Sequence, residues 1–266
     1  MNAAKLVSVA EKSHYPFKAY PQGPCRELLF CGCALPSQFP LTTDALAAAC
    51  RVHGMGVAFD CCGKPLSDWG EERAAARVTA VLGRRLARLG CERLVIACPN
   101  CLSYLRGRLD VECVSVYEAM LGWGDVARVR LNPGVLFVPC PDRVGRSIEG
   151  AVRELADLSA VATLRGVPCC GLRSEAAARG REFVDRCDAR IFAAAGEATI
   201  YTYCASCLGQ FARQGRGRVR HVLSALLGVD EAPDAAHALL NRARRMFDRE
   251  LGPLGPPMAP GRGEDA

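Results

Sequence analysis

The sequence predicts an α/β fold with parallel sheets, arranged as two tandem halves. Short apolar runs alternate along the chain with longer helical patterns, and this alternation is typical of parallel βαβ units. Cysteine motifs recur at a nearly constant spacing, which indicates that the two halves are related by internal duplication. The chain has 266 residues, of which 50% are hydrophobic and 23% are charged. This balance is that of a globular protein with one or two domains.

Three cysteine features carry the repeat, and they occur twice in the same order: a lone cysteine, the doublet CCG and the pair CxxC. The corresponding features lie 107, 108 and 106 residues apart. Because chance does not easily produce three agreeing offsets, we interpret the two segments as copies of one unit. The features are Cys33, Cys61-Cys62-Gly63 and Cys98–Cys101 in the first half, and Cys140, Cys169-Cys170-Gly171 and Cys204–Cys207 in the second.

The first half, residues 25–130, begins with an apolar run at 28–30, which predicts a buried strand that leads to Cys33. A helix is expected over 42–53, where Thr and Asp can cap its start. After CCG, a longer helix rich in Ala, Arg and Glu is expected over 71–89, with Gly90 as its stop. A strand over 93–97 runs into CxxC, and a last short strand is expected near 114–116.

The second half, residues 131–230, repeats this order. A strand is expected over 135–138, a helix over 147–158 and a longer helix over 174–195. A strand over 199–203 runs into the second CxxC, and a last strand is expected near 219–222. Ligands of open α/β sheets gather beyond the carboxyl ends of the strands, so we expect each half to collect five cysteines there.

Two segments lie outside the repeat. We expect residues 1–24 to be an extended N-terminal arm, and residues 231–266 to be a C-terminal helix followed by a disordered tail rich in Pro and Gly. The helix carries Leu239, Leu240 and Phe247 among several arginines. We expect it to pack on the second half, with a partner protein or a membrane surface as the alternative.

Charge and composition exclude several classes of function. The net charge is +6, with basic clusters at 213–220 and 242–249, but no recognition motif accompanies them and aromatic residues make up only 6% of the chain. We therefore expect no nucleic-acid partner, and we expect the basic clusters to be solvated. No apolar run reaches the roughly 18 residues of a membrane span, and no secretory signal is recognisable at the N-terminus. We expect a cytoplasmic protein, possessing 16 cysteines that bind metal or carry out redox chemistry instead of forming disulfides.

The number of thiolates in each half favours iron over zinc. Five thiolates exceed the four ligands of a structural zinc site, which usually combines two CxxC pairs about 15–20 residues apart. In this chain the CxxC pairs lie 106 residues apart. A multi-iron centre takes several thiolates, so the pattern favours an iron–sulfur site, with a zinc-stabilised scaffold as the alternative. Gly63 and Gly171 can provide the tight turns that direct adjacent sulfurs to one site.

The order Cys, CCG, CxxC, present twice, resembles the duplicated cysteine-rich CCG domain of heterodisulfide reductase and its relatives. The resemblance covers about residues 25–230 and implies two Rossmann-like halves, each of which binds one noncubane [4Fe-4S] cluster. The lone-cysteine step is shorter than in the best-known members, so Cys31 or Cys25 is an alternative to Cys33, although the repeat register favours Cys33. The implied ligands are Cys33, Cys61, Cys62, Cys98 and Cys101 for one cluster, and Cys140, Cys169, Cys170, Cys204 and Cys207 for the other.

The resemblance also implies an oxidoreductase subunit of the disulfide reductase type, active only within a complex. In that family a small disulfide is cleaved between the two clusters, and the electrons come from a ferredoxin-type iron–sulfur subunit that is fed by a flavoprotein subunit. This chain lacks the CxxCxxCxxxCP run of ferredoxin domains, as expected for a terminal subunit. The alternative is an electron-transfer subunit that exchanges electrons with a quinone without disulfide chemistry. Peripheral membrane contact through the C-terminal helix would favour that alternative.

The remaining candidates are expected to be structural. His53 and His221 could donate protons to a departing thiolate, but a lone histidine is more often structural. Lys64 could help an anionic substrate to approach, although ordinary surface is the expectation. Six cysteines are expected to be small buried side chains without a ligand role: Cys25, Cys31, Cys50, Cys91, Cys113 and Cys187.

Overall fold

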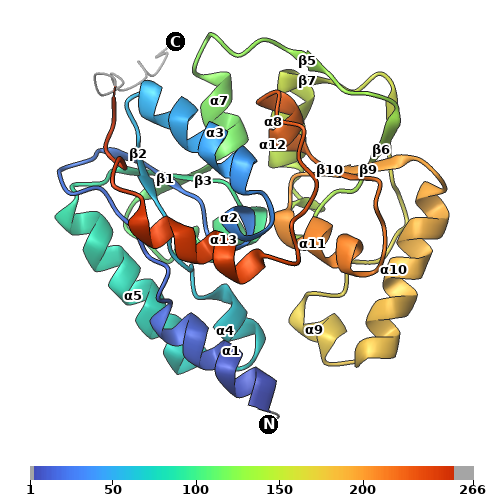
Figure 1. Ribbon diagram of the computed structural model, residues 1–266, viewed down its shortest axis with the longest axis horizontal. Coiled ribbons are helices and arrows are strands. Elements are labelled where there is room, and N and C mark those ends of the chain that lie inside the picture. The colour runs from blue at the N-terminus through green and yellow to red at the C-terminus, as the bar shows by residue number, and fades with distance from the viewer. Residues whose placement is uncertain (1–2, 255–266) are drawn as a thin grey trace.

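A parallel four-stranded sheet forms the centre of each of two lobes (Figure 1). The computed structural model describes residues 3–254. In the first sheet the strand order is β2-β1-β3-β4, and all neighbours are parallel. Leu28, Leu29 and Phe30 of the inner strand β1 are completely buried, as expected where helices cover both faces of a sheet. The strands are β1 (Glu27–Phe30), β2 (Gly56–Ala58), β3 (Arg93–Ile96) and β4 (Glu112–Ser115).

The second sheet has the corresponding order, β8-β6-β9-β10, and is also parallel throughout. The predicted α/β class with Rossmann-like parallel sheets is therefore confirmed. The matched order is what an internal duplication would produce, and the duplication itself stays a prediction. A separate parallel pair joins β5 (Val129–Arg130) to β7 (Ala156–Asp157). The strands of the second sheet are β6 (Gly134–Leu136), β8 (Val161–Thr163), β9 (Thr199–Thr202) and β10 (Val219–His221).

Helices connect the strands and cover the sheets (Figure 1). In the first lobe they are α1 (Ala3–His14), α2 (Ala34–Gln38), α3 (Pro40–Val52), α4 (Lys64–Asp68), α5 (Glu72–Arg88), α6 (Pro99–Leu105) and α7 (Val116–Leu121). In the second lobe they are η1 (Cys140–Asp142), α8 (Ser147–Leu155), α9 (Ser174–Ala177), α10 (Arg181–Ala195), α11 (Ala205–Arg213) and α12 (Val222–Leu226). The chain continues with α13 (Ala238–Arg244) and η2 (Arg245–Phe247).

The structure differs from the sequence expectations at several elements. Strands β2 and β8, which precede the two CCG doublets, were not predicted, because three residues are too few to show a periodicity. The helix expected over 174–195 is divided into α9 and α10, and Gly180 between them has a φ of +86°. The expectation that the N-terminal arm is extended was wrong, since α1 is a helix that packs on α4 and α5.

The segment after the second half returns to the first half. Helix α13 packs on α2, so the expectation that it packs on the second half was wrong (Figure 1). The Glu231 carboxylate accepts hydrogen bonds from the backbone N–H groups of Leu41 and Thr42, both at 2.8 Å, and from the Thr42 hydroxyl at 2.6 Å. Those N–H groups belong to the first turn of α3, where no helical carbonyl is available to them. The expected disordered tail lies largely at 255–266, outside the described residues.

We expect Glu231→Ala to lower the free energy of unfolding by about 2–3 kcal/mol, because it leaves buried donors at the start of α3 unpaired. Urea denaturation followed by circular dichroism measures this change. Glu250→Ala is the control, since the Glu250 side chain is 84% exposed and meets Arg51 only at 3.5 Å, and an exposed pair contributes about 0–1 kcal/mol. Equal stability of the two variants would contradict the predicted role of Glu231.

Candidate functional site

The strand ends of the first sheet position the first five cysteines. Cys33 follows β1 as the N-terminal cap of α2, and Cys98 follows β3 as the cap of α6. The CCG doublet follows β2, and its Gly63 has a φ of +90°. A Cβ at Gly63 would also lie 3.1 Å from the Ala75 carbonyl oxygen, so both the turn and the close packing require glycine. Because β1, β2 and β3 are parallel neighbours, these segments emerge at one edge of the sheet.

The five sulfurs of this first set are in contact with one another. Hydrogen bonds join Cys33 to Cys61, Cys61 to Cys62, Cys62 to Cys101, and Cys101 to Cys98. All are buried except Cys33, which is half-buried. The hydrogen bonds from Cys101 and Cys61 lower the pKa of Cys62 to about 6. The set therefore holds negative charge on sulfur in a place from which water is largely excluded.

The second five cysteines have the same positions relative to their strands. Cys204 caps α11 after β9, and Cys140 begins η1. Gly171 has a φ of +79°, and a Cβ there would lie 2.4 Å from Val184. The Cys170 and Cys207 sulfurs are 3.1 Å apart.

Two further hydrogen bonds complete the second set: Cys207 contacts Cys204, and Cys140 contacts Cys169. The hydrogen bond from Cys140 lowers the pKa of Cys169 to about 6, and the Gly171 N–H donates to the same sulfur at 3.2 Å. Unlike the first set, this one has two half-buried members, Cys140 and Cys169.

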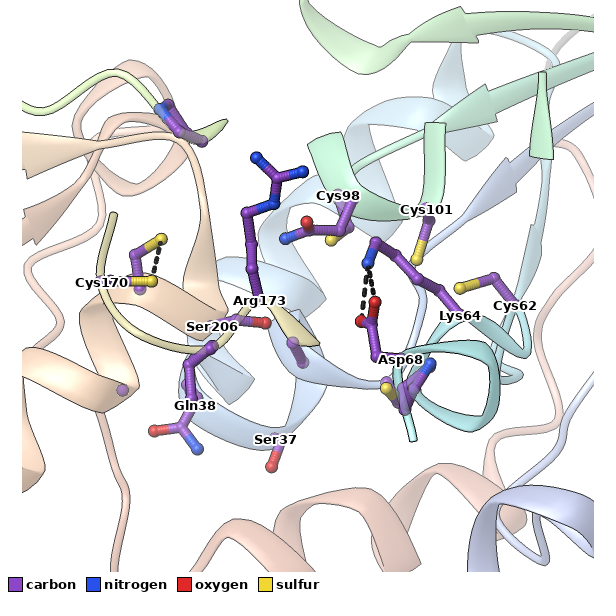
Figure 2. Close-up of a pocket in the computed structure, with 18 of the residues that line it drawn as sticks. Ser37, Gln38, Cys62, Lys64, Asp68, Cys98, Cys101, Cys170, Arg173 and Ser206 are labelled. Atoms are coloured by element: carbon purple, nitrogen blue, oxygen red, sulfur yellow. Dashed lines mark hydrogen bonds and ion pairs between the residues drawn. The ribbon is translucent and has the colours of Figure 1, made fainter. Parts of the chain in front are cut away.

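Both sets open onto a single cavity of about 390 Å³ between the lobes. Figure 2 shows Cys62, Cys98 and Cys101 on one side of this cavity and Cys170 on the other, with the Arg173 side chain between them. The sets also meet directly, because the Asn100 side-chain amide donates to the Cys204 sulfur at 3.5 Å. The lining cysteines are Cys33, Cys62, Cys98, Cys101, Cys140, Cys170 and Cys207.

The donor set fits an iron–sulfur cluster better than a single ion. Within residues 3–254, no group of three or more His, Cys, Asp or Glu side chains is arranged to hold one metal ion. A multi-iron cluster distributes its cysteine ligands over several irons, so its ligands do not have to converge on one point. Each lobe supplies five adjacent thiols that do not form disulfides, which matches the soft ligands that iron–sulfur centres take.

The other six cysteines lie apart from the two sets and are buried. Burial raises the pKa of Cys31 to about 12, so this thiol stays protonated. The Cys25 thiol donates to the Glu27 carbonyl at 2.8 Å and accepts from the Gly56 N–H at 3.0 Å. The structure thus brings Cys33, and neither Cys31 nor Cys25, into contact with Cys61.

Neither histidine candidate reaches the cavity. His221 is 1% exposed and accepts from the Leu223 N–H at 3.2 Å, and burial lowers its pKa to about 3. It is a neutral cap of α12. His53 stacks on Trp123 with ring centroids 4.2 Å apart. Both are structural side chains, as expected.

Several polar residues of the cavity were not predicted from the sequence. Lys64, expected on ordinary surface, lines the cavity and pairs with Asp68 at 2.6 Å (Figure 2). Lys12 and Arg242 also line it, from α1 and α13. The basic cluster at 242–249 was expected to be solvated, but the Arg242 and Arg245 side chains are only 15% and 8% exposed. No local pattern marks these residues, since none belongs to the cysteine repeat.

Comparisons with known proteins support the motif assignment in the first lobe. A family model described as the cysteine-rich domain CCG matches residues 28–106, which contain the whole first set. This domain is found in heterodisulfide reductase subunits. No curated protein matches the chain. Among solved structures, glutamate racemase from Campylobacter jejuni subsp. jejuni is similar with 10% identity and a TM-score of 0.38, over 83% of this chain and 98% of that one.

The contacts predict different consequences for two neighbouring cysteines. Cys33→Ala should reduce the metal bound per chain by about half, because one five-thiol set loses a ligand that caps an iron. Cys31→Ala should leave bound metal unchanged, since Cys31 touches no member of the set. Iron, zinc and acid-labile sulfide analysis of anaerobically purified protein measures the difference. Metal loss in Cys31→Ala alone would show that the wrong cysteine was chosen.

The pKa of Cys169 predicts a pH dependence in metal-free protein. A pKa of about 6 means that Cys169 is mostly thiolate at pH 7, so its alkylation by iodoacetamide should rise through pH 6 and level off above pH 7. Peptide mass spectrometry after timed labelling gives the rate. Cys140→Ala removes the hydrogen bond and should shift the midpoint toward the ordinary value of about 8.5. An unchanged midpoint in Cys140→Ala would contradict this account.

Proposed function

We propose that this chain is the iron–sulfur subunit of a heterodisulfide reductase-like complex and cleaves a small disulfide reductively. One observation carries the proposal: two separate five-cysteine sets face a single cavity. Pockets of roughly 300–1,000 Å³ hold small molecules, and this one is about 390 Å³. A disulfide bound there would lie between the two sets.

The two lobes would divide the work of holding two [4Fe-4S] clusters of the noncubane type. Cys33, Cys61, Cys62, Cys98 and Cys101 would hold one, and Cys140, Cys169, Cys170, Cys204 and Cys207 the other. When bound, such a cluster supplies one electron at a time and a Lewis-acidic iron. The low dielectric around the first set strengthens the electrostatic interactions of every group in the cavity.

Cleavage consumes two electrons and two protons, and converts one disulfide into two thiols. Two one-electron sites on opposite sides of one cavity match this stoichiometry. Negative charge develops on both sulfurs as the bond breaks. Arg173 lies between the sets (Figure 2) and, with the Asn100 amide, provides donors that stabilise this charge.

The electrons have to come from outside this chain. We propose a ferredoxin-type iron–sulfur subunit as the direct donor and a flavoprotein subunit behind it. The support is the absence of the CxxCxxCxxxCP run of ferredoxin domains from the sequence. The small disulfide and these subunits are the proposed partners, and nucleic acid is not among them.

A second candidate is an electron-transfer subunit that exchanges electrons with a quinone. One surface favours it: Leu239, Leu240 and Phe247 are 60%, 59% and 72% exposed next to the exposed Arg244. Apolar side chains flanked by arginines are typical of helices that lie on a membrane surface. Every helix in the described part of the chain is too short or too polar to span a bilayer, so contact of this kind would be peripheral.

Metal analysis and oxidant titration test the proposal together. Protein purified anaerobically should contain about eight irons and eight sulfides per chain and give paramagnetic signals on reduction. Stoichiometric zinc without iron would instead identify the zinc-stabilised scaffold. The dithionite-reduced protein is then mixed with small disulfides or with a water-soluble quinone. Reoxidation by a disulfide, with two thiols released, supports the reductase, whereas reoxidation by the quinone alone would overturn it in favour of the relay.

A further inference from the structure

Two buried cations stand at one end of the cavity, and neither belongs to the duplicated cysteine-containing halves. Lys12 of α1 is 8% exposed, and the Arg242 side chain of α13 is 15% exposed. Both pair with the same carboxylate, Glu11, at 2.9 and 3.0 Å. One carboxylate neutralises only one of the two charges. A net charge of +1 therefore remains in this part of the cavity.

Aromatic rings hold both cations in place. The Lys12 ammonium lies 5.0 Å from the centre of the Tyr15 ring, and the Arg242 guanidinium lies 5.3 Å from that of Phe17. The two rings pack edge to face at 5.5 Å. Cation–π contacts of this kind stabilise a desolvated charge. The cations are thus ordered before any ligand arrives, which reduces the entropy lost on binding.

Two buried polar atoms of this region have no hydrogen-bond partner among the described residues. They are the Gln38 side-chain oxygen Oε1 and the Arg242 Nε–H, and both residues line the cavity. Gln38 is 6% exposed. A Cβ on Gly209 would lie 2.7 Å from Gln38 Oε1, so glycine leaves the space that this oxygen occupies. An unpaired buried polar group costs about 1–3 kcal/mol, and a ligand with a matching acceptor and donor would remove that cost.

The other cations of the cavity are neutralised or exposed. Lys64 is bound by both oxygens of Asp68 at 2.6 and 2.7 Å. Arg173 and Arg213 are exposed to solvent, which screens their charge. The uncompensated and desolvated charge is therefore confined to Lys12 and Arg242.

We propose that Lys12, Arg242 and Gln38 form a subsite for a carboxylate-bearing arm of the disulfide. The carboxylate would accept from the Lys12 ammonium and the Arg242 Nε–H, and an adjacent amide N–H would donate to Gln38 Oε1. A net charge of +1 matches a carboxylate better than a doubly charged phosphate, particularly beside thiolates. The substrate class is therefore a disulfide of amino-acid-like or peptide-like thiols. That it is a disulfide rests on the proposed function, whereas the subsite requires only binding.

The test uses a non-reducible pair of probes, so that binding is measured without electron transfer. N,N′-diacetyllanthionine is a thioether with a carboxylate next to an amide N–H in each arm, and its bis(methylamide) differs only in lacking the carboxylates. Calorimetric titration of the anaerobically purified protein should show about tenfold tighter binding of the acid, the effect of one charge-assisted hydrogen bond. Lys12→Met and Arg242→Met should each reduce this preference to about threefold or less.

Three further variants make the outcome decisive. Lys18→Met removes the same charge near α1 but outside the cavity lining, and should keep the preference. Arg242→Lys keeps the charge without the Nε–H, and should fall between Arg242→Met and the parent even if Arg242→Met folds poorly. Gln38→Leu should weaken both probes by a similar factor, because both carry the amide N–H.

Equal affinity of the parent protein for the two probes would overturn the subsite, as would an unchanged preference in Lys12→Met or a loss of it in Lys18→Met. These results are independent of the reductase test. A protein that shows the Lys12-dependent preference but reduces no disulfide keeps the subsite and refutes the proposed function. A protein that reduces neutral disulfides equally well and shows no preference keeps the function and refutes the subsite.

Discussion

The parallel arrangement of β1, β2 and β3, and of their counterparts in the second sheet, is the constraint on which the rest of the molecule depends. Parallel neighbours end at the same edge of a sheet, so cysteines that are up to 68 residues apart in sequence come into sulfur contact. The left-handed glycines Gly63 and Gly171 then turn each CCG doublet toward the other cysteines. An antiparallel order would send the same motifs to opposite ends of the sheet and disperse the sites.

A second constraint is the fixed position of the lobes relative to one another, since the cavity exists only between them. Thr42 and Ser224 meet across the lobes at 2.7 Å, and Glu231 binds both Thr42 and the start of α3. Gly209 of α11 admits the Gln38 side chain of α2 at a distance that any side chain would block. These contacts are buried and hydrogen-bonded, so a small displacement of the lobes would leave polar groups unpaired.

The electrostatics of the cavity follow from burial on one side and solvent access on the other. The first set is enclosed and lies beside Lys12, whereas Cys140 and Cys169 of the second set are half-buried. Solvent exposure and nearby charge both shift the reduction potential of an iron–sulfur site. Two sites of the same ligand pattern would thus differ in potential, which suits chemistry in which two single electrons are delivered in turn.

By itself the sequence determined the α/β class, most of the strands and helices, and the two sets of cysteines, because hydrophobic periodicity and motif spacing are local or repeated signals. Even the choice of Cys33 over Cys31 followed from the repeat register and agrees with the sulfur contacts. Only the tertiary structure decided that both sets face one cavity, that α13 packs on the first lobe, and that Lys12, Gln38 and Arg242 meet beside Cys33. Those residues are separated by up to 230 positions and carry no repeated pattern. Their meeting depends on how the lobes and the terminal segments pack, which no local pattern encodes.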